Sequence, residues 1–135
     1  EAGNISDAIL KITRSHPYYT QQLAFMVWEL LNRYGYSVEI VETAADEIVT
    51  SHDNDFELLW NTLNRTDMVV LTGMSSTDIS PLSAEFSNLF GTGAASTVFS
   101  ALQRLIKKGM IIKEGSAYFI DDPFFRRWIE YRRRG

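Results

Sequence analysis

Residues 94–128 read AASTVFSALQRLIKKGMIIKEGSAYFIDDPFFRRW. Apolar residues recur in the first part of this stretch at spacings of three and four, which predicts a helix over Ala94–Lys108 that Gly109 ends. A shorter helix over Pro81–Phe90 is expected before it, because proline suits the first turn of a helix. Gly91-Thr92-Gly93 lies between the two, so the pair predicts a helix-turn-helix.

A hairpin and a terminal helix are expected directly after this pair. Met110–Lys113 and Ala117–Ile120 are β-prone runs on either side of Glu114-Gly115-Ser116, which predicts two antiparallel strands joined by a turn. Asp121-Asp122-Pro123 is a typical cap and first turn of a helix. These elements predict a winged helix, with the hairpin as its wing, within a mainly α-helical protein.

The N-terminal part of the chain is expected to form a small helical subdomain. Its predicted helices span Ile5–Thr13, Pro17–Tyr34 and Ser37–Ser51, with Ser37 as an N-cap. His52-Asp53-Asn54-Asp55 is a polar break, and we place the domain boundary there. The chain would then consist of a helical subdomain at 1–52 and a winged-helix domain at 53–135. Within the latter, a helix near 56–63 and a short buried helix near 68–71 should precede the helix-turn-helix.

Composition excludes several kinds of site. The 135 residues include no cysteine and two histidines, so we expect neither a metal site nor a catalytic triad. No apolar run is long enough to cross a bilayer and residues 1–20 lack the pattern of a signal peptide, which favours the cytoplasm and no membrane partner. The net charge is −4, with 3 − 7 = −4 in residues 1–51 and 9 − 4 = +5 in residues 104–135.

Two groups of motifs resemble the C-terminal part of prokaryotic AAA-like or STAND-type ATPases, often called archaeal ATPases. His16-Pro17-Tyr18-Tyr19, Gln22-Leu23 and Trp28-Glu29-Leu30-Leu31 are similar to the "GHPYYLQ…LWELL" helix of the family's lid, with Ser15 where the family has glycine. The second group is similar to the family's winged helix and its "Y-x-x-x-DP-x-x-RRW" ending. It comprises Ala94–Val98, Ala101–Leu105, Lys108–Ile111 and Tyr118–Trp128.

The resemblance implies that the chain is a lid and a regulatory winged helix that act on a nucleotide-binding domain N-terminal to them in the same parent protein. ATP or ADP would bind through that core, with no cofactor expected for this chain alone. In the family the proline lies near the adenine, which makes Pro17, with His16 and Arg14, the candidate nucleotide contacts. The structural alternative is that Pro17 only starts a helix and that His16 only caps it. No G-x-x-x-x-G-K-[ST] loop is present, so we expect no hydrolysis by the chain itself.

The predicted helix at Pro17–Tyr34 carries a second apolar line in addition to its main stripe. Tyr18, Phe25 and Trp28 form this line. A helix that is apolar on two sides is covered twice, either by another local helix or by the nucleotide-binding domain.

Two other functions remain open. In a DNA-binding regulator, the helix from Ala94 would present polar and basic side chains to DNA. The candidate contacts are Ser96, Thr97, Ser100, Gln103, Arg104, Lys107 and Lys113. The first half of that helix holds no cation, however, which weighs against groove reading. In a structural interaction domain, Phe124, Phe125 and Trp128 would form a dimer contact or bind another protein.

Overall fold

The computed structural model describes residues 2–134 and divides into two compact units. Unit 1 comprises Glu1–Asn54 and unit 2 comprises Asp55–Gly135, whereas the sequence placed the boundary after His52. Among the described residues, no helix combines the length and the apolar character that crossing a membrane requires.

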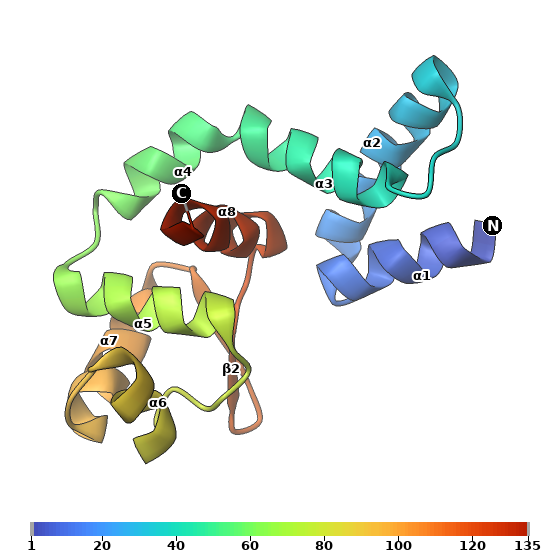
Figure 1. Cartoon of the computed structure of the whole chain (residues 1–135). Helices are drawn as coiled ribbons and strands as arrows, with labels where there is room; N and C mark the ends of the chain where they lie inside the picture. The colour runs from blue at the N-terminus through green and yellow to red at the C-terminus, as the bar shows by residue number, and fades with distance from the viewer. Residues whose placement is uncertain (1, 135) are drawn as a thin grey trace. The chain divides into compact units, whose positions relative to one another are not determined.

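Unit 1 consists of three helices, α1 (Ala2–Thr13), α2 (Pro17–Tyr34) and α3 (Ile40–Ser51) (Figure 1). α2 packs along α3, and α1 packs against both. α3 supplies most of the core with small and aliphatic side chains. They are Ile40, Val41, Ala44, Ala45, Ile48 and Val49. From α2 only Leu23 and Val27 are buried, so one side of α2 faces the core and the rest of it does not.

The start of α3 corrects the sequence prediction. Ser37 is not its N-cap, because the helix begins at Ile40 and Glu39 holds the cap position without a side-chain hydrogen bond. The Ile40 N–H donates to the Ser37 carbonyl at 3.2 Å, so the chain makes a tight turn at Ser37 and the helix starts where the apolar stripe starts. The predicted polar break is also wrong in part, since α4 begins at Asp53, where an acidic first turn suits the helix dipole.

The described part of unit 2 contains α5 to α8, a hairpin and all but the first two residues of α4, in the order that the sequence predicts. The elements are α4 (Asp53–Trp60), α5 (Arg65–Ser76), α6 (Ala84–Phe90), α7 (Ala95–Lys107), β1 (Ile111–Glu114), β2 (Ala117–Ile120) and α8 (Pro123–Arg134). The strands pair antiparallel, with Ile111 opposite Ile120 and Glu114 opposite Ala117. α5 packs against α7, α8 and α6, and is therefore the central helix of the unit (Figure 1).

Local hydrogen bonds explain where these helices begin. The Asn64 side chain accepts from the Asp67 N–H at 2.8 Å, so α5 begins earlier and is longer than the predicted segment at 68–71. α6 starts at Ala84 rather than at Pro81, because the Ser83 hydroxyl accepts from the Phe86 N–H and caps it there. The expected cap at Asp122 is confirmed, since its carboxylate accepts from the Phe124 N–H at 2.8 Å.

The aromatic residues of α8 lie inside unit 2. Phe56 contacts the rings of Phe125 and Trp128 at centroid distances of 5.3 and 6.0 Å, and Trp60 contacts Trp128 at 5.9 Å. Phe124, Phe125 and Trp128 are buried. The predicted dimer contact through these three residues is therefore wrong, because they complete the core of their own unit.

α5 and α6 approach each other closely at Gly73. A Cβ atom at this position would lie 2.4 Å from the Phe86 Cζ atom and 2.8 Å from the Phe90 Cδ2 atom, which is closer than packed atoms come. Only glycine leaves room for the two rings, which contact each other at 4.7 Å. Gly73 therefore fixes the position of the first helix of the helix-turn-helix.

Candidate functional site

The predicted nucleotide contacts lie together at the corner between α1 and α2. Pro17 is the first residue of α2, and the His16 Nδ1 atom accepts a hydrogen bond from the Tyr18 N–H at 3.2 Å. The His16 ring also contacts the Tyr19 ring at 4.6 Å. Because Nδ1 is an acceptor, the proton of the neutral ring is on Nε2, which remains a donor. His16 is thus the N-cap of α2, and its Nε2–H group remains a hydrogen-bond donor. Pro17 is exposed.

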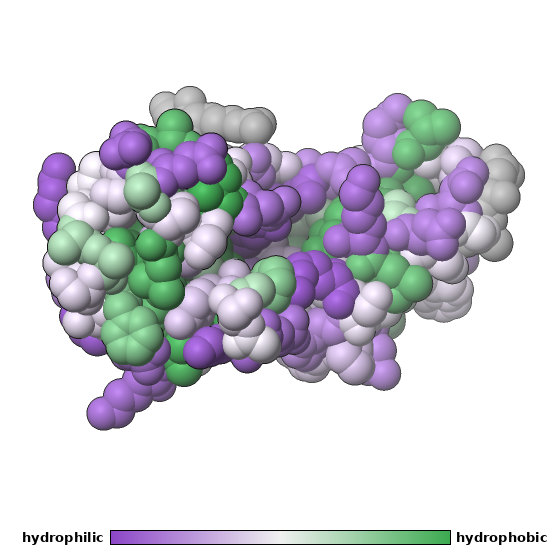
Figure 2. Space-filling view, turned by 90° about the horizontal axis from the view of Figure 1, so that it is seen from below, coloured by the Kyte–Doolittle hydropathy of each residue, from purple (hydrophilic) through white to green (hydrophobic). Residues whose placement is uncertain are grey.

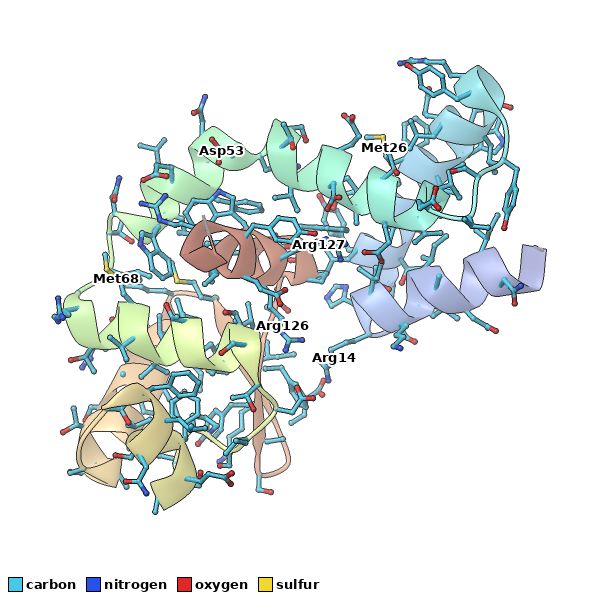
Figure 3. All side chains as sticks on the ribbon, viewed as in Figure 1. Arg14, Met26, Asp53, Met68, Arg126 and Arg127 are labelled. Atoms are coloured by element: carbon cyan, nitrogen blue, oxygen red, sulfur yellow. The ribbon has the colours of Figure 1, made fainter. Side chains whose placement is uncertain are left out.

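Arg14 and Ser15 bring the chain around this corner in the left-handed region, with φ of 53° and 61°. This conformation favours glycine, which gives a physical reason for the glycine that the resembled family has in place of Ser15. The corner is held by Thr13, whose hydroxyl donates to the Ile9 carbonyl at 2.9 Å and lies 2.7 Å from the Thr20 hydroxyl. The Arg14 side chain is exposed (labelled in Figure 3).

α2 carries an exposed aromatic face. Tyr18, Phe25 and Trp28, the predicted second apolar line, are 66%, 64% and 60% exposed. At ~100° per residue they lie on the side of α2 away from Leu23 and Val27, which are buried. The aromatic face therefore contributes nothing to the core of unit 1, and the prediction that another local helix covers it is wrong.

In unit 2, the predicted DNA contact Arg104 forms an ion pair with a buried carboxylate. Its Nη2 atom lies 2.7 Å from Asp67 Oδ1, and its Nε atom lies 3.3 and 3.4 Å from the two oxygens. Asp67 is 1% exposed and the Arg104 side chain 42%. The hydrogen bonds that Arg104 donates to Asp67 raise the pKa of its guanidinium, desolvation lowers it, and the carboxylate charge raises it further. The guanidinium thus joins α5 to α7 and is only partly available to a ligand.

The other predicted DNA contacts lie on the surface of α7 and on the wing. Ser96, Thr97, Ser100, Gln103 and Lys107 are exposed along α7. Lys113, on β1, is also exposed, and its Nζ atom lies 5.6 Å from the centroid of the Tyr118 ring. The α7 surface is not purely polar, because Phe99 is exposed on it and Leu89 is exposed on α6. Figure 2 looks onto this side of unit 2, where apolar residues lie among polar ones.

The sequence analysis did not identify two residues in the first turn of α5. Asp67 is the partner of Arg104, and Arg65 precedes it in the first turn of α5. The pattern Asn64-x-x-Asp67 is a helix-start signal that could have placed both residues in a first turn. No local signal indicates the contact with Arg104, which is 37 positions away.

Helix-turn-helix, hairpin and terminal helix define unit 2 as a winged-helix domain. The model of the family described as "probable winged helix domain" matches residues 54–131, and the chain belongs to this family. No curated protein and no solved structure matches the chain.

Proposed function

We propose that the chain is the lid and regulatory winged helix of a prokaryotic P-loop ATPase, and that it couples the nucleotide state of the ATPase core to domain rearrangement. In this proposal unit 1 is the lid and the chain performs no chemistry of its own. The observation that carries the proposal is the exposed aromatic face of α2, which the fold of unit 1 leaves uncovered.

The aromatic face offers enough apolar surface for a stable intramolecular contact. Aromatic side chains bury roughly 200 Å² each, so three that are 66%, 64% and 60% exposed offer about 380 Å². At about 25 cal/mol per Å², covering them contributes roughly 9 kcal/mol before the costs of association. A domain linked in the same polypeptide reduces those costs, because the contact is then intramolecular.

The start of α2 suits a nucleotide at the edge of this contact. The first turn of a helix presents N–H groups without intrahelical partners and a partial positive charge. His16 adds an Nε2 donor and Pro17 an exposed apolar ring. We infer that the core holds the phosphates of ATP or ADP and that Pro17 and His16 pack near the base.

Calorimetry with ATP and ADP tests this proposal on two polypeptides. One is the present chain, and the other also includes the nucleotide-binding domain that we propose lies N-terminal to it. We expect binding by the longer form only, weakened by Pro17→Ala. Pro123→Ala is the matched control, since Pro123 is the first residue of α8 in unit 2. If the longer form does not bind nucleotide, or if both variants weaken binding equally, the proposal is wrong.

A second experiment tests the aromatic face without nucleotide. We expect Phe25→Ser to weaken binding of the chain to the separately expressed core by at least tenfold, because an apolar side chain is removed from the contact. Leu58→Ser is the matched control, since Leu58 is 68% exposed on α4 and lies in unit 2. Equal effects of the two substitutions would exclude the aromatic face as the contact.

A further inference from the structure

The surface that α6 and α7 form carries no charge over most of its length. From Phe86 to Gln103 the sequence contains no Asp, Glu, Lys, Arg or His, although 22% of the whole chain is charged. Charged residues are depleted in the centre of protein–protein interfaces, whereas solvated surfaces contain many of them. The composition of this surface is therefore that of an interface. Its exposed residues on α7 include Ser96, Thr97, Phe99, Ser100 and Gln103.

A groove lies between α6 and the start of α7. The Ser87 hydroxyl donates to the Gly93 carbonyl at 2.8 Å and joins α6 to the turn before α7. The groove has a volume of about 340 Å³, and the residues that line it include Ala84 on α6 and Ala95 and Val98 on α7. None of its lining residues is charged, so the groove can accept an apolar side chain.

Phe99 projects from α7 beside this groove. It is 47% exposed and lies four residues after Ala95, which lines the groove. Residues four positions apart are neighbours on one face of a helix. A projecting ring and a groove are thus adjacent on the same surface. Such a surface is self-complementary, because a two-fold axis can place the ring of each copy in the groove of the other.

The polar groups of this face also match a second copy of the chain. Ser96, Ser100 and Gln103 are exposed at spacings of four and three along α7. A hydroxyl or an amide both donates and accepts hydrogen bonds, so each of these side chains can pair with the same kind of group. A charged face would instead repel its own copy.

The charges at the two ends of the uncharged stretch have opposite signs. Glu85 is exposed in the first turn of α6, and Lys107 is exposed at the end of α7. The first turn of α6 lies near the start of α7, since Ala84 and Ala95 line the same groove. If the α7 helices of two copies lie antiparallel, Glu85 of one copy and Lys107 of the other are on the same side of the contact. This orientation is favoured by charge.

We propose that unit 2 forms a two-fold dimer with a second copy of this chain, in which the α7 helices lie antiparallel and Phe99 of each copy enters the groove of the other. The inference concerns unit 2 alone and does not depend on the ATPase proposal. This dimer covers the exposed face of α7, so dimerisation and DNA binding through that face exclude each other.

The extent of the surface determines how strong the contact is. α7 has 13 residues and is about 20 Å long, and two adjacent helices are about 20 Å wide. Each copy contributes roughly 400 Å², so the dimer buries about 800 Å², less than the roughly 1,200 Å² of stable interfaces. We therefore expect a weak dimer, with a Kd of about 10–100 µM.

Sedimentation velocity of the full chain between about 1 and 200 µM tests the proposal. We expect the sedimentation coefficient to increase with concentration. F99E should raise the Kd at least about tenfold, because it would bring a carboxylate into an uncharged groove. The matched control is L58E, since Leu58 is 68% exposed on α4 in the same unit, and it should leave the Kd unchanged. Circular dichroism of each variant confirms that the fold is retained.

Cross-linking tests which residues face their own copies. The chain contains no cysteine, so a bismaleimide can join a single introduced cysteine only to the same position of a second copy. Ser100 is near the middle of α7 and should lie close to Ser100 of the other copy in an antiparallel pair. We expect a covalent dimer of S100C and none of S116C, the matched control in the exposed turn between β1 and β2.

Four results would overturn the proposal. One is a sedimentation coefficient that stays constant up to about 200 µM. Another is an equal effect of F99E and L58E on the Kd. A third is equal cross-linking of S100C and S116C. The fourth is loss of the dimer in F25S but not in F99E, which would assign the contact to the aromatic face of α2 in unit 1.

Discussion

Replacement of Arg104 by methionine should destabilise unit 2 by about 2 kcal/mol. Methionine keeps most of the length of the side chain and removes the partner of Asp67, which is 1% exposed. Loss of one partner from a buried ion pair costs about 3–5 kcal/mol, because the remaining charge is left unpaired. The Arg104 side chain is 42% exposed, so water can reach Asp67 once the guanidinium is gone, and we discount the cost to about 2 kcal/mol.

Thermal unfolding followed by tryptophan fluorescence measures this effect in unit 2. Trp60 and Trp128 are buried in unit 2 and should change their emission on unfolding, whereas Trp28 is exposed already. For a domain of this size, about 2 kcal/mol lowers the Tm by roughly 10 °C. The matched control is Lys107→Met, which removes an exposed cation of the same helix and should change the Tm by no more than about 3 °C.

The double variant D67L/R104M separates the ion pair from general damage to the packing. Replacing both partners of a buried pair by apolar residues is often neutral, so we expect the double variant to recover stability relative to R104M. The reasoning is refuted if R104M and K107M have equal Tm values, or if D67L/R104M is as unstable as the sum of the single variants. Because the pKa of Arg104 is raised in the folded state, the stability that its ion pair contributes is present at every pH below the ordinary pKa of arginine. The loss of Tm caused by R104M should therefore not change between pH 6 and pH 9.

Three further changes follow from the backbone and the surface. Gly73→Ala should destabilise unit 2 by about 1–3 kcal/mol in urea unfolding, because its Cβ would overlap the Phe86 ring. Gly3→Ala is the control and should not destabilise the protein, because the space around Gly3 is open. Ser15→Gly should stabilise unit 1 by about 0.5–1 kcal/mol, because Ser15 has a φ of 61°, which glycine adopts without strain. Ser6→Gly, in α1, should destabilise unit 1 by a similar amount. Circular dichroism during urea unfolding measures both changes, and changes of the same sign would contradict the argument. Trp28→Gln should change stability by less than about 0.5 kcal/mol and remove the tryptophan most accessible to acrylamide quenching, and a larger loss of stability would mean that the aromatic face is part of the core.

Most of unit 2 could be predicted from the sequence because its signals are local. The period of the apolar residues in α7, the glycines that end α6 and α7, and the Asp122 cap each depend on residues a few positions apart. Predictions of helix starts failed where two local signals competed. Pro81 suited a helix start, but the Ser83 hydroxyl caps α6 three residues before Phe86.

The functional features could be predicted only in part. The apolar line on α2 could be identified from periodicity, but whether it was buried depended on which helices of unit 1 cover it. The role of Arg104 could not be seen at all, because Asp67 reaches it through the packing of α5 on α7.

The cores of the two units differ in how many aromatic side chains they contain. Unit 2 encloses Phe86, Phe124 and Phe125 completely, and its core requires their volume. The core of unit 1 is built largely from the aliphatic side chains of α3, among them Ala44 and Ala45. Phe25 and Trp28 therefore add nothing to the core of unit 1, and the cost of exposing them to water favours the partner contact that we propose for α2.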